Sequence, residues 1–123
     1  MAVISNLDQL ALDNELYLNV IDTGNYGQVT IMKLLPGEEI EPETHADVTQ
    51  ITKIVTGYGK LHLKTEQKYF DQGDLIIISP GKYHHFINDG TVIIRLWTYY
   101  TSPEHLANDK FDTEQDYLDR QED

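Results

Sequence analysis

Hydrophobic and polar positions along the first hundred residues form short runs that are typical of β-strands, several of them alternating between the two classes. Four such segments cover residues 27–37, 51–64, 73–89 and 91–101. Turn-forming Pro-Gly and Asp-Gly pairs or single glycines interrupt or separate them at intervals of about ten residues. No helical period is strong enough for a βαβ unit. The pattern therefore predicts an all-β sandwich or barrel of at least eight strands over about residues 20–101.

The end of the chain, 102–123, has a different character. It is rich in acidic residues, and Thr113 stands where it can cap a helix whose first turn is acidic. We expect a short helix near 113–121, packed through Tyr117 and Leu118, and we expect any helix of note to be confined to this end. The charged run is interpreted as a solvated face.

Composition narrows the possible functions. The chain has 123 residues, a net charge of −12 and no cysteine. This length favours a single domain over 1–123, and the negative charge disfavours nucleic acid and anionic membrane surfaces as partners. Without thiolates, a metal must be bound by imidazole, carboxylate or amide groups. The N-terminus has no basic leader and no apolar run approaches the roughly 20 residues of a membrane span, so we expect a cytoplasmic location.

The stretch EPETHADVTQ contains the first candidate ligands. On a strand, Glu43 and His45 would share one face, and Gln50 would follow on the next strand after a bend. His84 would arrive from a separate strand after a Pro-Gly turn. These four side chains would supply one carboxylate, one amide and two imidazoles, a set that suits a divalent zinc, manganese, iron or nickel ion without selecting among them. The alternative is a polar surface strand that carries a histidine.

The spacing of these residues resembles a known motif. Gly37, Glu43, His45, Gln50 and Gly57 are separated by five, one, four and six residues. The first motif of the cupin superfamily has Gly, His, x, His, Glu and Gly at the same spacings. Glu43 stands at the position of the first histidine of that motif, and Gln50 stands at the position of its glutamate.

A second segment is similar to the second cupin motif. It comprises Gly73, Ser79, Gly81, His84 and Asn88, separated by five, one, two and three residues. Ser79 occupies a position where proline is usual. The short interval between the two motifs is like that of small bacterial cupins with one domain.

A narrower resemblance is to the small cupins called phosphomannose-isomerase-like, through the segments PGEEIEPETH and YTSPEH. It covers about residues 20–115. The resemblance implies a double-stranded β-helix, also called a jelly-roll barrel, with one metal ion inside it.

Other side chains are assigned by strand alternation. Five should face inward: Gln28, Thr30, Met32, Phe86 and Asn88. Trp97 or Tyr99 should form an aromatic wall, while core packing is the alternative for the whole set. His62 and His85 are expected on the surface, and Lys33, Lys53 and Arg95 in outward salt bridges. His105 is expected to make a structural hydrogen bond.

Two classes of function remain open. The first is a metal enzyme that acts on a small polar substrate by Lewis-acid chemistry, with Glu43 or a bound water handling the proton. Phosphomannose isomerases bind zinc with Gln-x-His, Glu and His, and this chain has the same ligand types with Glu and Gln exchanged. An iron-dependent dioxygenase is a further possibility. The second class is a module that binds a small ligand or a metal without turnover. A homodimer formed through sheet edges is expected in either case.

Overall fold

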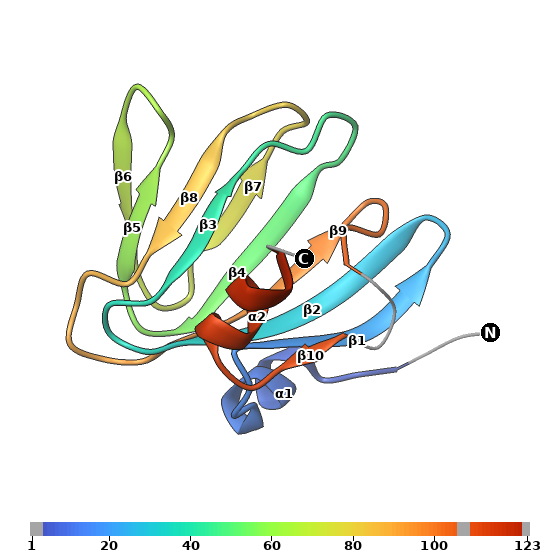
Figure 1. The fold of residues 1–123 in the computed structure, drawn as a ribbon, viewed down its shortest axis with the longest axis horizontal. Helices are drawn as coiled ribbons and strands as arrows, with labels where there is room; N and C mark the ends of the chain where they lie inside the picture. Colours follow the sequence, from blue (N-terminus) through green and yellow to red (C-terminus); the bar gives the residue numbers. More distant parts are fainter. Residues whose placement is uncertain (1–3, 106–108, 122–123) are drawn as a thin grey trace.

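The computed structural model describes residues 4–105 and 109–121, so parts of the predicted tail, 106–108 and 122–123, lie outside it. The described residues form two antiparallel sheets that face each other (Figure 1). One sheet has the order β10 (Lys110–Phe111), β1 (Leu18–Gly24), β2 (Gly27–Leu34), β9 (Ile94–Tyr100), β4 (Gln50–Thr56) and β7 (Leu75–Ile78). The other has the order β3 (Glu39–Glu43), β8 (His84–Ile87), β5 (Gly59–His62) and β6 (Gln67–Phe70). The predicted all-β jelly roll is confirmed.

The interior changes from apolar to polar along the central strands. In β9, the buried positions run from Ile94 and Leu96 to Thr98 and Tyr100, and each alternate residue is more exposed. β2 and β4 run in the opposite direction and show the same change, with the buried polar residues Gln28 and Gln50 near the start of each strand. Burial of each apolar side chain stabilises the fold by about 1.5–3 kcal/mol, so one end of the barrel supplies the core. The other end is lined by buried polar side chains, which are the groups a functional site requires.

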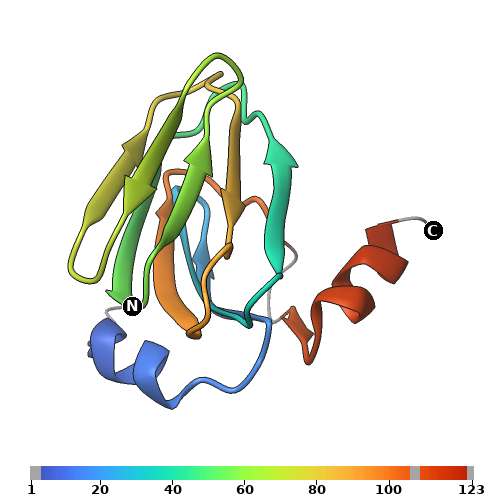
Figure 2. The same ribbon diagram turned by 90° about the vertical axis from the view of Figure 1, so that its left-hand side faces the viewer.

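The C-terminal helix is confirmed as α2 (Glu114–Gln121). Its N-terminus is capped as predicted, because the backbone N–H of Asp116 donates to Thr113 Oγ1 at 3.1 Å. The Tyr117 ring packs against Tyr17 and Phe111, with centroid distances of 5.7 and 5.3 Å. Figure 2 shows α2 projecting to one side of the sheets.

A second helix, α1 (Leu7–Asp13), contradicts the expectation that helices are confined to the C-terminal end. Asn6 caps it by accepting a hydrogen bond from the backbone N–H of Gln9 at 3.1 Å. Asp8 then accepts hydrogen bonds from Lys53 Nζ at 2.7 Å and from Trp97 Nε1 at 2.9 Å. A helix of two turns is too short to show a clear period in the sequence, and tertiary contacts such as these stabilise it.

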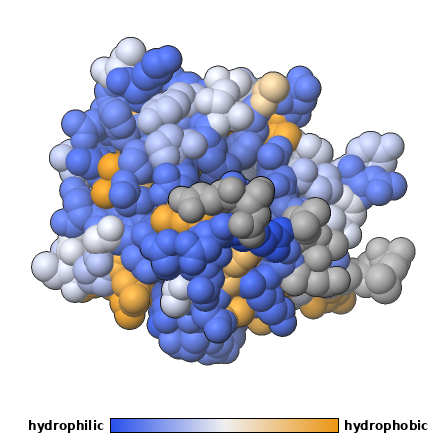
Figure 3. Space-filling view, viewed as in Figure 1, coloured by the Kyte–Doolittle hydropathy of each residue, from blue (hydrophilic) through white to orange (hydrophobic). Residues whose placement is uncertain are grey.

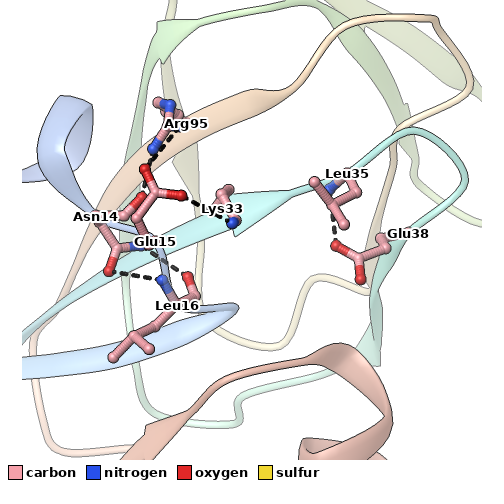
Figure 4. A network of polar contacts seen from close by, with 7 residues as sticks. All are labelled: Asn14, Glu15, Leu16, Lys33, Leu35, Glu38 and Arg95. Carbon is pink, nitrogen blue, oxygen red and sulfur yellow. Dashed lines mark hydrogen bonds and ion pairs between the residues drawn. The ribbon is translucent and has the colours of Figure 1, made fainter.

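The cations on the outer face of the large sheet form outward salt bridges, as predicted. Glu15 accepts from Lys33 Nζ at 3.2 Å and lies 3.4 Å from Arg95 Nη2, and Arg95 also donates to the carbonyl of Asn14 (Figure 4). These contacts attach the segment before β1 to β2 and β9. Lys53 makes the equivalent contact to Asp8 of α1.

The surface seen in Figure 3 is mainly hydrophilic, with small apolar areas. A more apolar feature is β7, the edge strand of the larger sheet, where Leu75 and Ile77 are 56% and 64% exposed. None of the helices in the described part of the chain combines the length and hydrophobicity that a membrane span requires.

Candidate functional site

Glu43, His45 and His84 meet at the polar end of the barrel. Glu43 is the last residue of β3 and lies directly opposite His84 of β8 in the antiparallel pairing. His45 Nε2 lies 3.0 Å from Glu43 Oε2, and the ring centroids of His45 and His84 are 5.1 Å apart. The prediction that Glu43 and His45 share one face of a strand was wrong, because β3 ends at Glu43 and His45 lies in the following loop. The loop is held by a hydrogen bond from Gly81 N to the His45 carbonyl at 2.7 Å.

Gln50 approaches the same region from β4. Its side chain is buried, and it pairs across the sheet with Tyr100, whose ring makes an edge-to-face contact with His45 at 5.8 Å. Gln50 Nε2 donates to Thr52 Oγ1 at 3.1 Å. Gln50 Oε1 is buried and has no hydrogen-bond partner among the described residues. The amide therefore has a free acceptor inside the barrel.

Both site histidines have the Nδ1 atom engaged by an outer partner. His84 Nδ1 donates to the Lys82 carbonyl at 2.8 Å, and His45 Nδ1 lies 3.1 Å from Glu104 Oε2. His45 Nε2 is buried and lies 3.0 Å from Glu43 Oε2, an ion-pair contact as close as that of Nδ1 to Glu104. Histidines that bind metals are commonly held through the second ring nitrogen in this way.

The pKa values of the three histidines of this region are shifted in different directions. The adjacent Glu43 carboxylate raises the pKa of His45, against the opposing effect of burial. Burial lowers the pKa of His84 and of His105, so both rings are neutral at neutral pH. A neutral His84 that donates from Nδ1 has its lone pair on Nε2.

Gln28 and Glu104 are site residues whose roles were missed by the sequence analysis. Gln28 Oε1 accepts the backbone N–H groups of Glu104 and His105 at 3.0 and 2.9 Å. Its Nε2 donates to the His105 carbonyl at 2.8 Å and to Thr23 Oγ1 at 3.0 Å. This buried amide fixes the segment that brings Glu104 to His45. These hydrogen bonds of His105 are made by its backbone, so the structural hydrogen bond expected of its side chain stays a prediction.

The aromatic wall is formed by a residue other than the two predicted. Tyr100 is buried at 3% exposure, whereas Trp97 and Tyr99 occupy the alternate positions of β9, on the outer face. The other inward predictions are confirmed, since all of those side chains are buried: Gln28, Thr30, Met32, Phe86 and Asn88.

His62 and His85 lie outside the barrel, as predicted. They are cross-strand partners on β5 and β8, with ring centroids 6.4 Å apart. His85 Nε2 lies 2.6 Å from Glu39 Oε1. Both side chains therefore belong to the outer face of the smaller sheet.

A cavity of about 390 Å³ opens beside the candidate site. Glu43, Glu104, His105, Tyr117 and Arg120 contribute to its lining, so it lies between the polar end of the barrel and α2. A cavity of about 530 Å³ adjoins it and shares Glu43 and Tyr117. A third cavity, of about 480 Å³, lies between β6 and β7 and includes none of the candidate site residues in its lining.

As the side chains stand in residues 4–105 and 109–121, no three His, Asp or Glu groups are gathered into a set that could hold a metal ion. Glu43 is instead directed at His45. The available groups nevertheless fit a divalent ion chemically, because Glu43 Oε2 and His45 Nε2, 3.0 Å apart, are both common metal-ligand types and Gln50 Oε1 is buried without a hydrogen-bond partner among the described residues. A buried acceptor of this kind is destabilising unless something satisfies it.

The comparison with known families agrees with this fold. The Cupin_2 family, described as cupin domain, matches residues 30–99. The chain belongs to the cupin family. This match spans the strands from β2 to β9 and all four candidate ligands.

Two curated relatives of this cupin are themselves uncharacterised. Protein YrkC of Bacillus subtilis is 29% identical over 92% of this chain and 64% of its own length. Protein L612 of Acanthamoeba polyphaga mimivirus is 32% identical over 83% of this chain and 66% of its own length. The chain therefore spans slightly less than two thirds of each of these relatives.

Similar solved structures support the cupin fold. BH2720 from Bacillus halodurans has a TM-score of 0.91 and 22% identity, and the match covers 97% of this cupin and 95% of that chain. KdgF from Halomonas sp. has a TM-score of 0.62 at 15% identity, covering 71% of this cupin and 79% of that chain. A predicted oxalate decarboxylase from Thermotoga maritima has a TM-score of 0.59 at 18% identity, covering 72% and 95%. At these identities the likeness concerns the fold alone.

Proposed function

We propose that this cupin binds one divalent metal ion through Glu43, His45, Gln50 and His84 and acts on a small polar substrate. The observation that supports this most is Gln50 Oε1, a buried acceptor with no hydrogen-bond partner among the described residues, beside Tyr100, whose ring contacts His45. The engaged Nδ1 atoms of both histidines add to it, because they leave each Nε2 for an inner ligand.

When bound, the ion would supply Lewis-acid polarisation of a substrate carbonyl or hydroxyl group. The chain contributes the remaining functions. Glu43 lines the cavity of about 390 Å³ and is placed to take up and return a proton at a carboxylate oxygen. Glu104 holds His45 in orientation, and Gln28 holds Glu104. Tyr100 closes the inner side of the site against water.

We propose isomerase-like chemistry as the reaction class. This proposal is supported by the proposed ligand set, which has the same residue types as the zinc ligands of phosphomannose isomerases, with Glu and Gln exchanged. The narrower phosphomannose-isomerase-like resemblance, through PGEEIEPETH and YTSPEH, points in the same direction. YTSPEH also contains Glu104, which the structure places against His45.

The first test is elemental analysis of the purified protein and of four variants. His45→Ala and His84→Ala should abolish metal retention, and Glu43→Gln should lower it by removing the charged ligand. Gln50→Ala should lower it less, because a neutral amide is the weakest donor. His62→Ala is the matched control, since this histidine lies on the outer face. Stoichiometric metal in both histidine variants would overturn the proposal.

The second test is turnover, with and without a chelator, on sugars, diketones and thiols. Isomerisation that the chelator stops would support the proposed reaction. Dioxygen consumption by an iron-loaded protein would replace it with a dioxygenase. Tight ligand binding without turnover would replace it with a binding module.

A further inference from the structure

The barrel has two seams between the edges of its sheets, one between β3 and β10 and the other between β6 and β7. The first seam is bridged by α2. Glu114 of this helix accepts a hydrogen bond from the backbone N–H of Glu39 in β3 at 2.6 Å, and Tyr117 packs against Phe111 of β10. The second seam lies on the side of the molecule away from α2 (Figure 2).

The seam between β6 and β7 contains the cavity of about 480 Å³. Buried core side chains, including Leu61 and Phe70, form part of its lining. Large apolar side chains that are mostly exposed also line it: Tyr69 at 75%, Ile77 at 64% and Leu75 at 56%. All of the lining residues come from positions 61–82, so neither α1 nor α2 contributes to covering this cavity. The apolar core therefore continues to the surface at this seam.

The strand β7 differs from the other edge strands of the described sheets in how its edge is protected. β3 contains Pro42 and a register shift, β10 has two residues, and β6 carries Lys68. β7 has the sequence Leu-Ile-Ile-Ile and pairs with β4 in a continuous register. Exposed edges are normally blocked by short length, charge, proline or a bulge, because an open edge can pair with another strand. The apolar edge of β7 therefore favours a covering strand.

The charges around this seam favour a second copy of the chain as the source of that strand. The protein has a net charge of −12, so two copies repel each other over most of their surface. The lining of the seam is balanced instead, with two acidic and two basic side chains: Glu66, Asp74, Lys68 and Lys82. Two copies can therefore approach each other here without a net repulsion between like charges.

The order of these charges along the chain selects the orientation of the second copy. Asp74 directly precedes β7, and Lys82 follows its end. In an antiparallel pairing of two β7 strands, Asp74 of one copy is directed toward the end that carries Lys82 in the other. A parallel pairing would bring like charges together at both ends.

We propose that two copies of this cupin form a two-fold symmetric dimer in which their β7 strands pair in antiparallel orientation and close the seam between β6 and β7. The pairing joins the two larger sheets into one, and the backbone of each β7 edge gains hydrogen bonds from the other. It also places Leu75 and Ile77 of the two copies against each other, which covers the exposed apolar wall. A two-fold interface is self-complementary, so the assembly closes at two copies.

Charge variants at Ile77 test this pairing, because the two-fold arrangement places the two Ile77 side chains within reach of each other. Sedimentation velocity over a dilution series measures the dissociation constant of the dimer. Ile77→Lys and Ile77→Glu should each raise this constant at least about tenfold, since two like charges replace apolar contacts. An equimolar mixture of the two variants should form dimers again, because opposite charges then face each other.

Tyr26 provides the matched control. It is 86% exposed and lies between β1 and β2, which are separated from β7 by β9 and β4 in the sheet. Tyr26→Lys and Tyr26→Glu should leave the dissociation constant unchanged.

A second measurement uses the fact that the chain has no cysteine. A short bifunctional thiol reagent should join Ile77→Cys into a covalent dimer and should leave Tyr26→Cys largely unlinked. This comparison decides the question if circular dichroism shows that the charged Ile77 variants do not fold.

Four results would overturn the proposal. They are a wild-type protein that is monomeric at every concentration, a dimer that persists in Ile77→Lys, a monomeric mixture of the two Ile77 variants, and equal effects at Ile77 and Tyr26. A monomeric wild-type protein that binds an apolar dye, with binding lost in Ile77→Lys, would assign the seam to an apolar ligand or to a strand of another protein.

Discussion

Replacing Glu104 tests how far the metal centre depends on a residue that is not itself a proposed ligand. Glu104 Oε2 lies 3.1 Å from His45 Nδ1, and the two side chains are 24% and 9% exposed. Glu104→Ala removes this partner and lets the imidazole rotate, so metal affinity should fall about 10- to 100-fold. That range corresponds to about 1.4–2.8 kcal/mol of binding free energy. Glu104→Gln keeps an acceptor oxygen without its charge and should lose less.

The assay is a competition for zinc between the protein and a fluorescent chelator. Glu39→Gln is the matched control, because Glu39 contacts the outer-face His85 at 2.6 Å in a pair of the same chemistry. This control should retain wild-type affinity. Gln28→Leu should reproduce part of the Glu104→Ala effect, since Gln28 fixes the backbone of Glu104. Wild-type zinc affinity in Glu104→Ala, with an unchanged thermal midpoint, would refute the positioning role.

Three further predictions concern the scaffold. Phe86→Ala, at a fully buried core position, should lower the free energy of unfolding by about 3–5 kcal/mol in urea titration; a change below about 1 kcal/mol would show that the core is not packed as described. The hydrogen bond from Lys53, with that from Trp97, lowers the pKa of Asp8, so its contribution to stability is complete above the unfolded-state pKa, near pH 4, and is lost as the pH falls through the lower folded-state value. Loss of this contact should release α1 from the sheet, and Trp97 fluorescence should report the release. The loss of stability should be under about 1 kcal/mol because the pair is partly exposed, and Asp8→Ala should remove the transition. We expect a homodimer that uses the apolar edge strand β7, so Ile77→Lys should give a folded monomer in light scattering; a wild-type protein that is already monomeric would contradict this.

Much of the fold could be predicted from local patterns. Strand alternation and turn residues are properties of neighbouring positions, so the strand-bearing segments 27–37, 51–64, 73–89 and 91–101 and the cap at Thr113 were evident in the sequence, whereas β1, β6 and β10 were not. The two motifs also indicated which side chains would gather, and Glu43, His45 and His84 are indeed brought together. The ligand roles of these residues stay predictions.

The position of the aromatic wall shows where local patterns become ambiguous. Extending the alternation from Ile94 and Leu96 leads to Tyr100, which is the buried ring. Trp97 and Tyr99 lie at the intervening positions. Because aromatic residues occupy both alternating sets of positions, the sequence does not show which set faces inward. The pairing of Tyr100 with Gln28 and Gln50 in the sheet resolves the choice, and this pairing involves strands far apart in the sequence.

The sequence by itself determined the β-strands and the residue types available for a site, whereas the tertiary structure decided which atoms are free and which are engaged. Gln28 fixes the backbone of Glu104, 76 positions away, only because closure of the barrel brings β2 beside the chain that follows β9. That contact directs Glu104 to His45 Nδ1, while His45 Nε2 lies 3.0 Å from Glu43. Propensity and spacing act over a few residues, but hydrogen-bond satisfaction in a buried site depends on the whole fold, and for that reason the Gln28, Glu104 and His45 arrangement could not be predicted from the sequence.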